Sequence, residues 1–134
     1  MKALSIKQPW AWAIAYGFKT IETRTWPTAY RGELLIVSSL KPDRALLDWF
    51  QKETGMKVDH QMEYGKAIAI ANLVQCGPMT KADQDAALCD IYPGAYSWVL
   101  TDVRKIEPFP VKGQLGLYEV DLVEAGQEGK ICTT

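Results

Sequence analysis

Residues that bind metal ions or form disulfides are scarce in this sequence. It contains one histidine, His60, and three cysteines, Cys76, Cys89 and Cys132, and no two cysteines have the spacing of metal ligands. A structural zinc site needs four clustered ligands, and a disulfide framework uses cysteines in pairs. We therefore expect no metal, no cofactor and no disulfide, and this cysteine usage indicates a reducing cytoplasmic setting.

Long apolar runs and a surplus of one charge are also missing. No segment has the length and apolar character of a membrane span or a signal peptide, so we expect no membrane partner. The formal net charge is -1. This value argues against indiscriminate binding of polyanions through bulk charge.

The charge that is present is unevenly distributed along the chain. Residues 1–41 contain six basic and two acidic residues, whereas the remainder contains nine basic and fourteen acidic residues. The positive charge is therefore concentrated in the first third of the sequence. A local basic face on an otherwise acidic protein is typical of a confined anion site and less so of a long DNA-binding groove.

The length of 134 residues and the 48% of hydrophobic residues predict one folded domain with a hydrophobic core. Residues 1–123 contain no internal repeat and no linker rich in proline, glycine or serine. The last ten residues lack hydrophobic periodicity. We therefore predict one domain over residues 1–123 and a flexible C-terminal tail over residues 124–134.

Hydrophobic periodicity predicts a mixture of strands and helices. The expected strands are residues 3–6, 20–26, 33–39, 66–74, 96–100 (extended or paired by 103–109) and 117–122. The expected helices are residues 8–16, 42–52 and 80–88. Pro108 and Pro110 restrict the strand that contains them to a sheet edge. This order predicts an α+β fold, a small β-barrel of five or six strands flanked by two or three helices.

The segment from residue 17 to residue 26 carries the densest set of functional side chains. On a strand, side chains alternate between the two faces. Glu22, Arg24 and Trp26 then share one face, and Ile21 belongs to the other face, which is the better candidate for inward packing. Lys19 follows a glycine that ends the preceding helix, so it can reach over the same site.

This cluster has the chemistry to bind an anion or a nucleobase. An arginine, Arg24 or Arg31, can recognise a phosphate or a base edge through two hydrogen bonds, and Lys19 adds a point charge. Glu22 can hold the cations in place or accept a hydrogen bond from an exocyclic amine. The alternative interpretation is an ion-pair cluster with a purely structural role.

Aromatic and polar residues near the cluster complete the predicted site. Trp26, or Trp10 from the preceding helix, can stack on a base. Ser5 and Gln8 lie at the end of a strand, where binding residues often gather, and Tyr96 can stack or donate. For each of these residues, core packing or an exposed turn is the alternative. The predicted nucleic-acid contacts are Lys19, Glu22, Arg24, Trp10, Trp26, Arg31, Ser5, Gln8 and Tyr96.

The pattern Gly17-x-Lys19-x-x-Glu22-x-Arg24 resembles the G-x-K-x-x-E-x-R signature of ASCH domains, which belong to the PUA-like superfamily. Segments 4–11, 31–36, 96–100 and 110–118 resemble further motifs of the family in the same order, so the resemblance covers about residues 3–122. It implies a β-barrel with a cleft between the barrel and its flanking helices. It also implies that the cleft binds RNA, another nucleic acid or a nucleoside.

Three functions are open under this resemblance, because a fold does not select among them. The first is recognition of single-stranded RNA or a modified base. The second is a metal-independent ribonuclease or N4-acylcytidine amidohydrolase, with Lys19, Glu22 and Arg24 as catalytic residues. The third is a protein-interaction module. The resemblance implies that the family's cytidine-deacylating members use a Lys–Thr pair for catalysis. In this sequence Glu22 occupies the position of that threonine. Because Glu22 has no hydroxyl to attack an amide, recognition is favoured.

Overall fold

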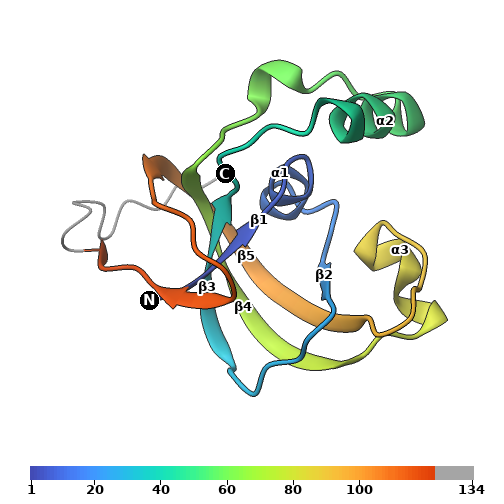
Figure 1. Cartoon of the computed structure of the whole chain (residues 1–134), viewed down its shortest axis with the longest axis vertical. Coiled ribbons are helices and arrows are strands. Elements are labelled where there is room, and N and C mark those ends of the chain that lie inside the picture. Colours follow the sequence, from blue (N-terminus) through green and yellow to red (C-terminus); the bar gives the residue numbers. More distant parts are fainter. Residues whose placement is uncertain (123–134) are drawn as a thin grey trace.

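The computed structural model describes residues 1–122, which form one six-stranded sheet and three α-helices (Figure 1). The strands are β1 Lys2–Ile6, β2 Ile21–Arg24, β3 Gly32–Ser38, β4 Lys66–Pro78, β5 Tyr96–Pro110 and β6 Leu117–Glu119. The helices are α1 Trp10–Ala15, α2 Arg44–Thr54 and α3 Gln84–Ala87. The predicted tail over residues 124–134 lies outside the described residues.

The strand order is β2-β5-β4-β3-β1-β6, with β1 parallel to β3 and the other neighbours antiparallel. The register between β4 and β5 shifts at three places along their length. Such irregularities bend a strand and increase its twist. The two long strands therefore curl the sheet into a partial barrel (Figure 1). The predicted α+β fold with a small barrel and flanking helices is confirmed.

Helix α1 packs against β3, β4 and β5 and fills the interior of the curled sheet. Its residues from Ala11 to Ala15 are all buried, and Ile14 packs with Leu34 of β3 and Trp98 of β5. This helix is almost entirely apolar because both of its sides face protein. It is shorter than the predicted span 8–16, since Pro9 caps it and the chain turns away after Ala15.

The structure refines the other predicted elements. Residues 96–110 form one strand, so the segment 103–109 extends the strand at 96–100, and the prolines lie where β5 pairs with β4 alone among the described strands. The segment 80–88 is split into a 3-10 turn, Lys81–Asp83, and the short α3, although Thr80 forms the expected capping box with Asp83. The polar segment 55–65 contains a 3-10 turn at residues 59–61.

Candidate functional site

The signature segment crosses from α1 to the sheet edge. Gly17 adopts a left-handed backbone with φ 83°, a conformation that glycine takes without strain. The amide of Lys19 donates to Ala13 O, and the amide of Thr20 donates to Ala86 O. Ile21 then buries its side chain in a small cluster beneath α3. These contacts fix the start of β2, so the polar residues that follow have defined positions.

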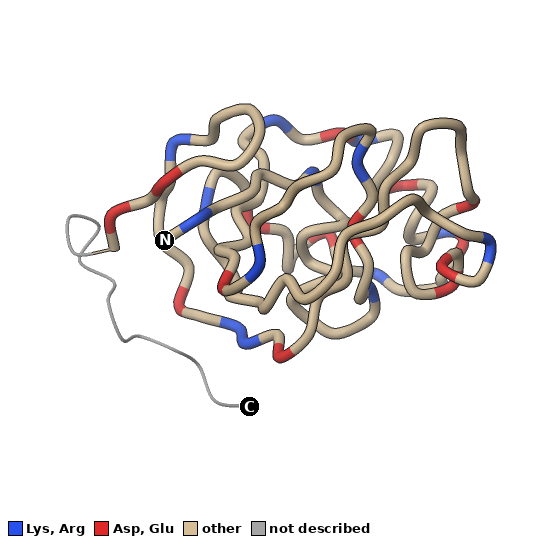
Figure 2. The backbone as a smooth tube through the Cα atoms, turned by 90° about the horizontal axis from the view of Figure 1, so that it is seen from below, with Lys and Arg blue, Asp and Glu red and all other residues tan. Residues whose placement is uncertain are grey.

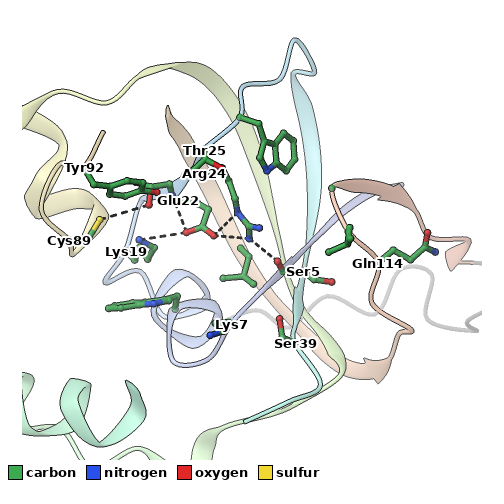
Figure 3. Close-up of a pocket in the computed structure, with 16 residues that line it drawn as sticks. Ser5, Lys7, Lys19, Glu22, Arg24, Thr25, Ser39, Cys89, Tyr92 and Gln114 are labelled. Atoms are coloured by element: carbon green, nitrogen blue, oxygen red, sulfur yellow. Dashed lines mark hydrogen bonds and ion pairs between the residues drawn. The ribbon is translucent and has the colours of Figure 1, made fainter. Parts of the chain in front are cut away.

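Glu22 lies at the centre of the charge cluster and is buried. Its Oε2 accepts two hydrogen bonds from Arg24, at 2.9 Å from Nη2 and 3.2 Å from Nε. Its Oε1 accepts from the amide of Thr23 at 3.1 Å and lies 3.7 Å from Lys19 Nζ (Figure 3). Glu22 and Arg24 therefore share one side of β2, as the alternation predicts. Both carboxylate oxygens therefore contact donors of the protein itself, with two hydrogen bonds to Oε2 and one to Oε1.

Lys19 is the buried cation of the cluster, with 3% of its surface exposed. Its ammonium donates to Ala87 O, faces Glu22, and lies 5.2 Å from the centroid of the Trp10 ring. Burial lowers the pKa of Lys19 from its ordinary value, and the negative charge of Glu22 opposes this change. Lys19 is thus a positive charge held in place by a carbonyl, a carboxylate and an aromatic face.

Arg24 is the more accessible cation, with 24% of its side chain exposed. Besides its two bonds to Glu22, its Nη2 donates to Ser5 O on β1 at 2.7 Å. The guanidinium therefore bridges the sheet edge and the first strand. No atom within residues 1–122 accepts a hydrogen bond from Nη1. This nitrogen is available to donate to a ligand in the pocket that Arg24 lines.

A pocket of about 570 Å³ opens over this cluster. Pockets of this size class bind nucleotide-sized or drug-sized ligands. The charged residues Lys19, Glu22 and Arg24 line it, and three aromatic residues contribute to its walls. Those aromatic residues are Trp10, Trp26 and Tyr92. The pocket therefore combines a fixed positive centre with flat apolar surfaces.

The structure brings six of the nine predicted contact residues into this pocket. They are Ser5, Trp10, Lys19, Glu22, Arg24 and Trp26. Trp26 packs edge-on against the buried Trp98, with ring centroids 4.9 Å apart, which fixes the Trp26 ring. The strand segment, the helix before it and the end of β1 thus converge where the alternation and the chain order indicated.

The other three predicted contacts lie outside the pocket lining. Gln8 is buried because its side chain satisfies backbone groups: Oε1 accepts from the amide of Trp12, and Nε2 donates to Glu63 O. The guanidinium of Arg31 donates to the carbonyls of Thr28, Tyr30 and Cys76, at 2.9, 2.8 and 3.4 Å respectively. Both side chains are therefore committed to backbone partners.

Tyr96 is the third predicted contact outside the lining. It pairs with Arg24 across the β2–β5 ladder and packs against the main hydrophobic core. Side chains of directly paired residues point to the same face of a sheet, but this partly buried ring packs against the core and does not line the pocket. The prediction rested on its place at the start of a strand, which does not determine how far the side chain is covered.

Sequence reasoning missed the wall formed by the loop between α3 and β5. Cys89 and Tyr92 from this loop line the pocket, and Figure 3 shows them on the side of Lys19. Gln114, from the loop between β5 and β6, lies on the opposite side in Figure 3, and Leu115 of the same loop also lines the pocket. These residues lie 70 to 96 positions from Lys19 along the chain, and no local pattern links them to it.

Within residues 1–122, no group of three or more histidine, cysteine, aspartate or glutamate side chains is arranged to hold a metal ion. His60 is exposed and lies in the 3-10 turn after α2. None of the helices in the same range is long and apolar enough to cross a membrane.

The fold is a partly closed β-barrel with a pocket where its first helix meets an edge strand. The ASCH domain model matches residues 4–110 of this chain, which therefore belongs to the ASCH domain family. The match includes the whole of the charge cluster. A search of curated proteins gives no match.

Solved structures of an ASCH protein from Zymomonas mobilis are similar in fold. The unsubstituted protein shares 15% sequence identity and a TM-score of 0.55, covering 94% of this chain and 91% of the other. A singly substituted form gives 14% identity and a TM-score of 0.56, covering 90% of this chain and 89% of the other. At this identity the likeness shows the fold, and function has to be argued from the site.

Proposed function

We propose that this chain binds single-stranded RNA by holding one nucleotide in the pocket over Lys19, Glu22 and Arg24. ASCH domains are generally thought to bind RNA, which supports the class of ligand. The observation that carries the proposal is the arrangement of one carboxylate between two cations beside stacking surfaces. Two positive charges and one negative charge leave the cluster with a net charge of about +1, which favours an anionic ligand.

The hydrogen-bonding state of Glu22 decides what the pocket recognises. Because Glu22 already accepts from Thr23 and Arg24 and faces Lys19, its carboxylate serves mainly to hold these protein groups in place. Arg24 Nη1 remains as a donor. The site therefore recognises hydrogen-bond acceptors, such as a phosphate oxygen or a base carbonyl, and Glu22 orients the cations.

The aromatic side chains supply the second part of recognition. Trp10 precedes the signature segment in the sequence and Trp26 follows it, and both side chains line the pocket. Ring contacts within the fold already fix both of them. A base that stacks on such a ring gains about 1–3 kcal/mol with little dependence on its identity. The pocket therefore accepts a nucleotide through its flat face and its phosphate.

The charge distribution limits how much of an RNA strand is bound. Figure 2 shows Lys and Arg positions interspersed with Asp and Glu positions over the described chain. A protein that neutralises many phosphates needs a continuous basic surface. We therefore propose contact with only a few phosphates and a shallow dependence of affinity on salt.

The protonation of Lys19 provides the test of this proposal. Burial favours the neutral amine, so Lys19 should lose its charge at a lower pH than the 10.5 of an ordinary lysine. The affinity for triadenylate should therefore be measurable at pH 7 and should fall as the pH rises toward 10. Adenine is the suitable base because it does not ionise over this range. Fluorescence anisotropy measures the binding.

Two variants separate Lys19 from other basic groups. Lys19→Met keeps the apolar stem but has no amine, so it should bind more weakly and lose the fall with pH. Lys7→Met removes an exposed lysine at the pocket rim and should keep the fall. Circular dichroism checks that both are folded. Absence of binding at pH 7 by the unsubstituted protein would overturn the proposed function.

A hydrolytic role is the second candidate, and one observation favours it. A buried lysine with a lowered pKa is the type of group that acts as a general base. Glu22 is less suited to that role because it accepts three hydrogen bonds from the protein and pairs with Arg24. Turnover of single-stranded RNA or N4-acylcytidine by the pure protein, lost in Lys19→Met, would support this candidate.

A further inference from the structure

Leu115 is a fully exposed apolar side chain at the rim of the pocket, with 99% of its surface accessible. Single exposed hydrophobic residues are ordinary on protein surfaces. Leu115 differs because it lines a pocket together with its neighbours Gln114 and Gly116. A ligand that occupies the pocket and crosses its rim can therefore bury the side chain of Leu115.

The loop that carries Leu115 is held at both ends. The amide of Val111 donates to Gly65 O at 3.0 Å, and Leu117 pairs with Leu4 of β1. Between these points, Gly113 approaches β1 so closely that a Cβ there would lie 3.0 Å from Ser5 Oγ. The loop therefore has a defined position relative to Ser5, the residue whose carbonyl holds Arg24.

The loop that carries Gln114 and the loop that carries Cys89 and Tyr92 lie on opposite sides of the charge cluster. Figure 3 shows Gln114 on one side, Cys89 and Tyr92 on the other, and the Glu22–Arg24 pair between them. A pocket of about 570 Å³ has room for one nucleotide. The neighbouring nucleotides of a bound strand therefore have to leave over the rim.

We propose that Leu115 packs against the face of the nucleobase next to the one in the pocket and keeps these two bases unstacked. The inference rests on the proposed function and adds a second contact to it. Apolar side chains act in this way in other nucleic-acid complexes, where they insert between neighbouring bases. Leu115 gains apolar contact, and the unstacked base enters the pocket alone.

The experiment compares two RNA probes. The first is triadenylate, and the second is the same trimer with abasic residues on both sides of the central adenosine. Leu115→Ala should weaken binding of triadenylate about fivefold, the loss expected for about half the burial of a leucine. It should leave binding of the abasic trimer unchanged, because that probe has no flanking base to contact.

Leu40→Ala is the matched control, since Leu40 is 78% exposed and lies outside the pocket lining. It should bind both probes like the unsubstituted protein. The inference is overturned if Leu115→Ala binds triadenylate with unchanged affinity or loses the same factor for both probes. If the unsubstituted protein binds neither probe, the proposed function itself fails, and the inference falls with it.

Discussion

Replacing Arg24 with alanine should lower the affinity for triadenylate by about 100-fold. A charge-assisted hydrogen bond contributes about 1.5–3 kcal/mol, and Arg24 has one nitrogen, Nη1, that is available to the ligand. The substitution also removes the partner that neutralises Glu22. A less compensated carboxylate would then face an anionic ligand, which increases the loss. Anisotropy titration at constant salt measures the change.

Arg31, seven residues after Arg24, offers a control for this substitution. Its guanidinium donates to backbone carbonyls and lies outside the pocket lining, so Arg31→Ala should change the affinity by less than about twofold. Both variants remove one positive charge. Equal losses of affinity in the two would mean that binding follows net charge, and the assignment of the pocket would be wrong.

Replacing Glu22 with glutamine should destabilise the fold by about 3 kcal/mol. Removing one partner of a buried ion pair leaves the other charge without compensation, at a typical cost of 3–5 kcal/mol. Lys19 is buried and depends on Glu22 for its only carboxylate contact among the described residues. The amide oxygen of the introduced glutamine can still accept a hydrogen bond from Arg24, which keeps the expected loss of stability near the lower limit. Urea denaturation measures the free energy of unfolding.

Glu33→Gln is the matched control for this substitution. Glu33 pairs with Arg104 at 2.8 Å, but its side chain is more than half exposed. An exposed pair contributes at most about 1 kcal/mol, so this variant should unfold close to the unsubstituted protein. A similar small change in both variants would show that Glu22 does not have the organising role assigned to it.

The sequence allowed the charge cluster to be predicted because its geometry is local. Residues two apart on a strand share a face, and this places Glu22 beside Arg24 without knowledge of the rest of the fold. Helix α1 and its approximate end at Gly17 follow from equally local rules for how helices start and stop. The barrel itself follows from the number and order of the elements, together with the family resemblance.

The parts that were not predicted depend on long-range packing. Tyr92 reaches the pocket because α3 packs against β2, and Leu115 reaches it because the chain returns along β1. Arg31 was predicted to bind because it is basic and close to the signature, yet nearby carbonyls hold its guanidinium. Position in the sequence does not reveal which backbone groups lack partners, and those groups determine where a long polar side chain points.

If RNA enters the pocket that Trp10 and Trp26 line, the NMR signals of their indole groups report its binding directly. A proton–nitrogen NMR titration with triadenylate should shift the Nε1–H signals of Trp10 and Trp26, which line the pocket. The signal of Trp12 should stay in place, because its Nε1 donates to Gln61 Oε1 outside that pocket. A shift of the Trp12 signal, with the signals of Trp10 and Trp26 unchanged, would contradict RNA binding in this pocket and place the ligand elsewhere.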